Sequence, residues 1–142
     1  MTVSSDTKLE LLRRVELFGG VEPRHLEKIA ERVVEVDFEA GRQIVREGDV
    51  GTGFYVVVEG SVSVIRDGRT VARLGQGDFF GELSILDHRP RIAQVVADEP
   101  TRCLALASWD LEAIMLEEPA LTVAILRGVA ARLRALTEES RH

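Results

Sequence analysis

Residues 53–74 read GFYVVVEGSVSVIRDGRTVARL, and this stretch decides the fold. It contains three short runs rich in β-branched residues, and glycine-containing turns separate them. The sequence RDGR at residues 66–69 predicts a two-residue hairpin, because Asp-Gly readily adopts the positive φ angles that this turn requires. The stretch therefore predicts consecutive antiparallel strands.

Outward from this stretch, the same pattern continues on both sides. The segment VVEVDFEAG, which begins at residue 33, alternates through Val34, Val36 and Phe38, with the period of two that is typical of a half-buried strand. Many short strands at regular spacing predict an antiparallel roll or sandwich over residues 33–107. The other predicted strand segments are RQIVREGD, RIAQVVADEP and RCLALA.

Helical patterns flank this region. On the N-terminal side, apolar residues recur at three-residue spacing over residues 7–17. Pro23 suits the first turn of a second helix, which is expected to end near residue 32. Residues 7–32 therefore predict N-terminal helices.

Two C-terminal helices are predicted over residues 108–136. Ser108 is expected to cap the first of them, with Trp109 anchoring that helix on the roll, and Pro119 opens the second. The second helix has three interpretations: packing on the roll, pairing with its twin in a homodimer, or closing over a pocket as a lid with Arg132 or Leu133 near the ligand. Its apolar stripe consists of Leu121, Ile125, Val129, Leu133 and Leu136.

Together these patterns predict one domain over residues 1–142. The fold class is mainly β with flanking helices: an antiparallel β-roll or jelly roll (double-stranded β-helix) with N-terminal helices and two C-terminal helices. The chain is long enough for a real hydrophobic core.

The composition limits the function classes. The net charge is −6 and the pI is about 5.1, so the chain as a whole repels nucleic acid and anionic membranes. No apolar stretch reaches the roughly 18 residues that a membrane span needs, and the N-terminus lacks the pattern of a signal peptide. The cytoplasm is the expected location, without direct binding to nucleic acid or membrane.

Metal and catalytic sites have little support. Cys103 is the single cysteine and lies in an apolar run, which favours a buried structural thiol. His25, His88 and His142 lack metal-ligand spacing, so neither a zinc site nor the metal centre of a cupin-like enzyme is expected. The order of residues suggests no Ser-His-Asp triad either. We expect no catalysis, no metal and no cofactor.

A possible binding site lies in FFGELSILDHRPRIAQVVA, residues 79–97, where Glu82 and Arg91 stand nine residues apart. One interpretation is a surface salt bridge with core packing around it. The other is a pocket for an anion that also carries hydroxyl groups. An arginine fork and the N–H groups of a short helical turn suit a phosphate, and a carboxylate suits a ribose hydroxyl.

This segment resembles the phosphate-binding cassette of the cyclic nucleotide-binding domain family. That family includes bacterial catabolite activator proteins, the regulatory subunits of protein kinase A, and cyclic-nucleotide-gated channels. The resemblance spans about residues 9–136. It is carried by Phe80, Gly81, Glu82, Leu83, Ser84, Arg91, Ile92 and Ala93, and upstream by Gly48, Asp49, Gly53, Tyr55, Val57 and Gly60.

The resemblance implies the role of each cassette residue. Arg91 would hold the cyclic phosphate, and Glu82 would accept the ribose 2′-hydroxyl. Many relatives have Ala, Ser or Thr at the position of Ile92. An isoleucine has no hydroxyl to bind the guanine amino group, which favours cAMP over cGMP. Backbone groups would complete the cradle at Gly81, Leu83, Ser84, Ile92 and Ala93.

The resemblance thus implies a cytoplasmic regulatory sensor module that binds a cyclic nucleotide and has no catalytic activity. Two alternatives remain open: a ligand-free scaffold of the same fold that associates through its last helix, and the sensor fragment of a larger transcriptional regulator. No helix-turn-helix is expected after residue 136.

Overall fold

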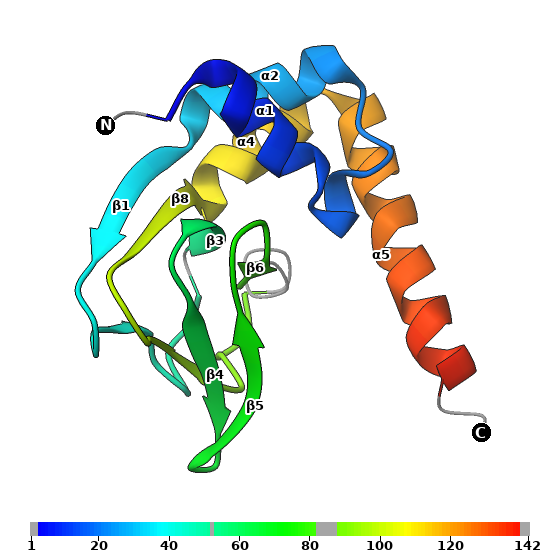
Figure 1. Ribbon diagram of the computed structural model, residues 1–142. Coiled ribbons are helices and arrows are strands. Elements are labelled where there is room, and N and C mark those ends of the chain that lie inside the picture. The colour runs from blue at the N-terminus through cyan, green and yellow to red at the C-terminus, as the bar shows by residue number, and fades with distance from the viewer. Residues whose placement is uncertain (1–2, 52, 82–87, 140–142) are drawn as a thin grey trace.

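The computed structural model describes residues 3–51, 53–81 and 88–139. Helices gather at one end of a β-roll, and the last helix extends away from the other helices, to one side of the roll (Figure 1). In chain order the elements are α1 (Ser5–Arg13), the 3-10 helix η1 (Glu16–Phe18), α2 (Pro23–Arg32), β1 (Val34–Phe38), β2 (Gln43–Val45), β3 (Gly53–Glu59), β4 (Val62–Arg66), β5 (Arg69–Leu74), β6 (Phe79–Phe80), β7 (Gln94–Ala97), β8 (Thr101–Ala107), α4 (Ser108–Glu117) and α5 (Pro119–Glu139).

The described strands form two four-stranded sheets, in the orders β1-β8-β3-β6 and β2-β7-β4-β5. All pairs are antiparallel, and most neighbours are distant in sequence, as in a jelly roll. Arg66 pairs with Arg69, and the turn between them has positive φ at Asp67 (52°) and Gly68 (76°). The predicted β-roll and its hairpin at residues 66–69 are confirmed.

The central strands β3 and β8 are buried on both faces. On β8, Leu104 and Leu106 pack against the helices, whereas Cys103 lies inside the roll. This double burial explains why these strands read as nearly continuous apolar runs. The cluster inside the roll consists of Val45, Val57, Val62, Phe80, Val95 and Cys103.

The prediction of a buried thiol is confirmed, because Cys103 is 0% exposed. Burial raises the pKa of the Cys103 thiol to about 12. The thiolate is the reactive form, so the side chain is shielded both sterically and electronically.

We expect Cys103 to resist thiol reagents in the native protein at mildly alkaline pH and to react fully in denaturant. The measurement is thiol titration with a chromogenic disulfide reagent, with and without guanidinium chloride. Rapid reaction without denaturant would mean that the roll opens readily between its sheets.

The first helical segment differs from the expected continuous helix over residues 7–17. Helix α1 ends at Arg13, and the chain tightens through i→i−3 bonds, from the Arg14 and Val15 N–H groups to the carbonyls of Leu11 and Leu12. The tighter winding turns apolar side chains inward over the following residues. Val15, Leu17 and Phe18 are all buried.

Two predictions for the start of α4 are wrong. Ser108 is the first residue of the helix, not its cap; Ala107 occupies the cap position, without a side-chain bond. Trp109 is 64% exposed and so does not anchor the helix on the roll. Leu111 and Ile114 form the buried face, and Trp109 lies about 200° round the helix axis from Leu111.

Helix α5 packs against the rest of the molecule through its first half. Leu121 and Ile125 are buried, whereas Leu133 and Leu136 are 64% and 53% exposed. At Gly128 the helix passes very close to η1: a Cβ atom there would lie 2.9 Å from the Leu17 carbonyl oxygen. The second half of α5 extends beyond the other helices (Figure 1). None of the helices within the described residues has the length and apolar character needed to cross a bilayer.

Candidate functional site

The predicted cassette connects β6 to β7, the strands that flank residues 81–93. The structure describes four of the seven predicted site residues: Gly81, Arg91, Ile92 and Ala93. Glu82, Leu83 and Ser84 lie outside the described residues. The predicted roles of these three residues stay predictions.

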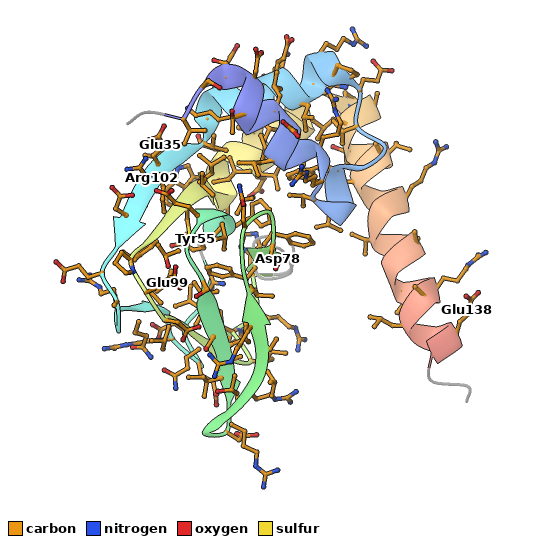
Figure 2. The ribbon with its side chains drawn as sticks, in the orientation of Figure 1. Glu35, Tyr55, Asp78, Glu99, Arg102 and Glu138 are labelled. Carbon is orange, nitrogen blue, oxygen red and sulfur yellow. The ribbon has the colours of Figure 1, made fainter. Side chains whose placement is uncertain are left out.

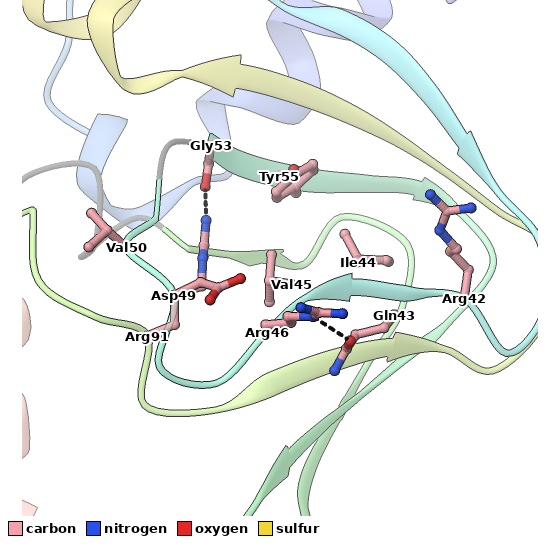
Figure 3. A pocket seen from close by; sticks show the side chains of 10 residues that line it. All are labelled: Arg42, Gln43, Ile44, Val45, Arg46, Asp49, Val50, Gly53, Tyr55 and Arg91. Carbon is pink, nitrogen blue, oxygen red and sulfur yellow. Dashed lines mark hydrogen bonds between the residues drawn. The ribbon is translucent and has the colours of Figure 1, made fainter.

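Arg91 is held by its backbone and by its side chain. Its N–H donates to the Asp49 carbonyl over 2.8 Å, and its own carbonyl accepts from the Gly48 N–H over 2.8 Å. Its guanidinium Nη2 donates to the Gly53 carbonyl over 2.7 Å (Figure 3). The loop before β3 therefore fixes both the position and the direction of this side chain.

Gly81 lies against the same guanidinium, at a positive φ of 88°. A Cβ atom at Gly81 would lie 2.7 Å from Arg91 Nη1 and 2.8 Å from the Gly53 carbonyl oxygen. Both the backbone conformation and the close approach require glycine. The structure thus brings Gly81 and Arg91 together, although ten positions separate them in the sequence.

Ile92 and Ala93 stand between Arg91 and β7, which begins at Gln94. The Ile92 side chain is 68% exposed, and Ala93 is half-buried. Neither side chain belongs to the cluster inside the roll, where Val95 is the buried β7 residue. The predicted part that their backbone groups play in binding a ligand stays a prediction.

A pocket of about 480 Å³ lies beside Arg91, between β2 and the start of β3 (Figure 3). Its charged side chains are Arg42, Arg46, Arg91 and Asp49. Its apolar side chains are Ile44, Val45 and Val50, and Gln43, Gly53 and Tyr55 are the other described residues that line it.

Tyr55 belongs to an aromatic group inside the roll (Figure 2). Its ring stacks on Phe80, with the centroids 5.1 Å apart and the planes at 16°. It also meets Phe38 edge-on, at a centroid distance of 6.2 Å. These contacts fix the ring that forms one wall of the pocket.

The sequence-based prediction did not include Arg42 and Arg46. The two arginines flank β2, and β2 shifts register between Gln43 and Val45, so the alternation of a strand does not place them on one side. The sequence did not show that they line one pocket with Arg91 and Tyr55. Among the described residues, no group of three or more His, Cys, Asp or Glu side chains is arranged to hold a metal ion.

Comparison with known proteins gives a consistent result. A family model described as "Cyclic nucleotide-binding domain" matches residues 35–118. The chain is 32% identical over 130 residues to a CRP-like cAMP-activated global transcriptional regulator of Mycobacterium tuberculosis. That match covers 88% of this chain and 58% of the regulator.

A second relative is a cAMP-dependent protein kinase regulatory subunit of Mucor circinelloides f. lusitanicus. It is 36% identical over 99 residues, which are 67% of this chain and 23% of that protein. The chain therefore spans little more than half of one curated relative and about a quarter of the other.

Among solved structures, the chain is similar to the N-terminal domain of a transcriptional regulator from Streptomyces coelicolor A3(2). The TM-score is 0.81 at 35% sequence identity, over 91% of this chain and 93% of that one. The likeness therefore extends over nearly the whole of both chains.

Proposed function

Because the chain belongs to the cyclic nucleotide-binding domain family, we propose that it is a regulatory sensor that binds a cyclic nucleotide at its cassette without chemical turnover. The observation that carries this proposal is the cluster of Gly81, Arg91 and Gly53. A guanidinium held against a glycine backbone suits a phosphate group, which needs both a charge and room for close approach.

The contact with Gly53 supports this role for Arg91. A guanidinium has five N–H donors in one plane, so a 2.7 Å bond from Nη2 to a backbone carbonyl sets the direction of the whole group. Such preorganisation lowers the entropy lost when the ligand binds. In the proposed complex, Arg91 holds the cyclic phosphate and Glu82 accepts the ribose 2′-hydroxyl.

We further propose that cAMP is preferred over cGMP. Ile92 has no hydroxyl group to bind the guanine amino group. The names of these two relatives, a cAMP-activated regulator and a cAMP-dependent kinase subunit, also refer to cAMP. The absence of catalysis is part of the same proposal, since these relatives are a transcriptional regulator and a kinase regulatory subunit.

Thermal unfolding with and without ligand tests the proposal. At a cAMP concentration one hundred times Kd, the native state should gain about 2.7 kcal/mol, which raises Tm by roughly 8 °C. Under the proposed preference, cGMP at the same concentration gives a smaller shift. An unchanged Tm with both nucleotides would favour the ligand-free scaffold.

Helix α5 supports a second proposal, that the chain forms a homodimer through this helix. Leu126, Val129, Leu133 and Leu136 follow the alternating spacing of three and four residues found in coiled coils. Leu126, Leu133 and Leu136 are each more than half exposed. A second copy of the helix would cover this stripe.

Replacing Leu126 and Leu133 with glutamate should therefore convert a dimer to a monomer, because like charges would face each other across the interface. Sedimentation velocity measures the mass of wild type and variant. Ala131→Glu, which adds a charge at an exposed position on the opposite side of the helix, is the control and should stay dimeric. A monomeric wild-type protein at micromolar concentration contradicts this proposal.

The regulatory response to ligand binding is also a proposal, and it is based on the relatives described above. Ligand binding would shift the population of helix positions, and a longer regulator or a partner would respond to that shift. With its net charge of −6, the chain is not proposed to bind nucleic acid itself.

A further inference from the structure

Helix α4 carries apolar side chains on two opposite sides. On one side, Leu111 and Ile114 lie in the core. On the other side, Trp109, Ala113 and Leu116 are exposed, and Leu116 is 80% exposed. A surface helix usually has a polar outer face, because apolar side chains are stabilised only when they leave water. The outer face of α4 therefore has the composition of a surface that another molecule covers.

Trp109, Ala113 and Leu116 form one continuous stripe, which we call the α4 stripe. Successive residues of an α-helix are about 100° apart, so these three side chains fall within about 60° of one another. The stripe extends over about 10 Å along the helix axis. Ala113 lies between the two larger side chains, and its short side chain leaves a gap that suits an apolar side chain of a partner helix.

Acidic side chains border the α4 stripe on both sides. Glu112 is three residues from Trp109 and four from Leu116, which places it along one side of the stripe. Glu117 is four residues from Ala113 and lies along the other side. Both glutamates are exposed. Helix α4 contains three acidic residues and no lysine or arginine, so the helix itself supplies no counter-charge.

The neighbouring elements neutralise little of this charge. Arg32 of α2 pairs with Asp110 over 3.2 Å. Between described residues, no ion pair within 4.0 Å involves Glu117. Glu112 lies 3.9 Å from Nε2 of His88, which is charged only when the imidazole is protonated. Both borders of the stripe therefore retain negative charge that a basic partner would neutralise.

From these features we propose that the α4 stripe is a docking surface for a basic amphipathic helix of another protein. Apolar side chains of that helix pack between Trp109 and Leu116, and its Lys or Arg side chains meet Glu112 and Glu117 on either side. The same carboxylates repel nucleic acid and anionic membranes. The α4 stripe lies on a different helix from the leucines of α5 that are proposed to form the homodimer.

Fluorescence titration tests this proposal directly, because Trp109 is the single tryptophan of the chain. The probe is a synthetic amphipathic peptide of about 18 residues, built from leucine and lysine and long enough to form a helix. A second peptide has glutamate in place of each lysine. The lysine peptide should bind saturably and shift the Trp109 emission to shorter wavelength, because binding takes the indole out of water. The glutamate peptide should leave the emission unchanged.

The Leu116→Ser variant tests the apolar contact. It should weaken binding of the lysine peptide by about tenfold or more, and it should fold like wild type because the side chain is exposed. Val71→Ser is the matched control, since it makes a similar change at an exposed apolar residue of β5 and should bind like wild type. Undiminished binding by Leu116→Ser would overturn the proposal.

The double variant Glu112→Gln/Glu117→Gln tests the charged borders and should bind the lysine peptide about fivefold more weakly. Its control, Glu27→Gln/Glu31→Gln, removes the same charge from α2 on the side that faces α1, and should bind like wild type. Equal losses in the two double variants would reduce the effect to net charge and overturn the proposal.

Three results with the wild-type protein would also overturn the proposal. The first is the lack of a saturable emission shift with the lysine peptide at concentrations up to the millimolar range. The second is equal binding of the two peptides, which would indicate unspecific adsorption. The third is an emission shift on dilution of the protein alone that Leu116→Ser abolishes, which would assign the α4 stripe to a second copy of the chain.

Discussion

Replacing Arg91 with lysine should weaken cAMP binding by about tenfold to a few hundredfold while the fold is retained. A lysine keeps the positive charge but has no planar fork for a phosphate. It also lacks the geometry that lets one group donate to the Gly53 carbonyl and hold an anion at the same time. The Arg91→Ala variant should lose at least as much affinity for cAMP.

Isothermal titration calorimetry measures the affinity, and circular dichroism checks the fold. Arg69→Lys is the control, because it makes the same chemical change on the exposed hairpin and should bind like wild type. Gly81→Ala provides independent support, since its Cβ would displace the Arg91 guanidinium without removing it. Undiminished affinity in Arg91→Lys and Arg91→Ala would reject the cassette as the phosphate site.

Replacing Gly60 with alanine is expected to destabilise the protein by roughly 3 kcal/mol or more. Gly60 has a φ of 99°, and a Cβ atom there would lie 2.6 Å from Thr101 Oγ1 and 2.7 Å from the Pro100 carbonyl oxygen. The turn after β3 is pressed against the turn before β8, and two of the three nearest atoms, the Pro100 carbonyl oxygen and Thr101 Cα, belong to the backbone. A backbone atom cannot rotate away from the new methyl group as a flexible side chain can.

Denaturation with guanidinium chloride measures this loss of stability. Gly68→Ala is the matched control: Gly68 also has positive φ, but a Cβ atom there would meet nothing within 4 Å. The Gly68→Ala variant should lose only about 1 kcal/mol of stability, which is the energy of backbone strain alone. Similar losses in the two variants would mean that the contact with Pro100 and Thr101 relaxes freely.

Much of the fold could be predicted because the strand signals are local. The Asp67-Gly68 turn and the apolar runs of β3 and β8 act through near neighbours, and the predicted roll followed from them. The start of α4 was harder to predict from the sequence. Ser108 and Trp109 have residue types typical of a cap and a core anchor, but the burial of Leu111 decides which face turns inward.

The site could be predicted only in part, for a different reason. The cassette motif contains both Gly81 and Arg91 in one short segment, and the structure brings them together, while their part in binding stays a prediction. The bond from Arg91 to Gly53 joins residues 38 positions apart and depends on how β3 is placed in the roll. The approach of Arg42 and Arg46 to Arg91 depends on the same long-range packing. No local pattern contains that information.

The crossing of α5 over η1 has a mechanical consequence. Gly128 brings the two backbones so close that α5 cannot turn about its own axis at this point without pushing the Leu17 main chain. A change in the tilt of the C-terminal helix would therefore also displace η1, the segment that lies between α1 and α2.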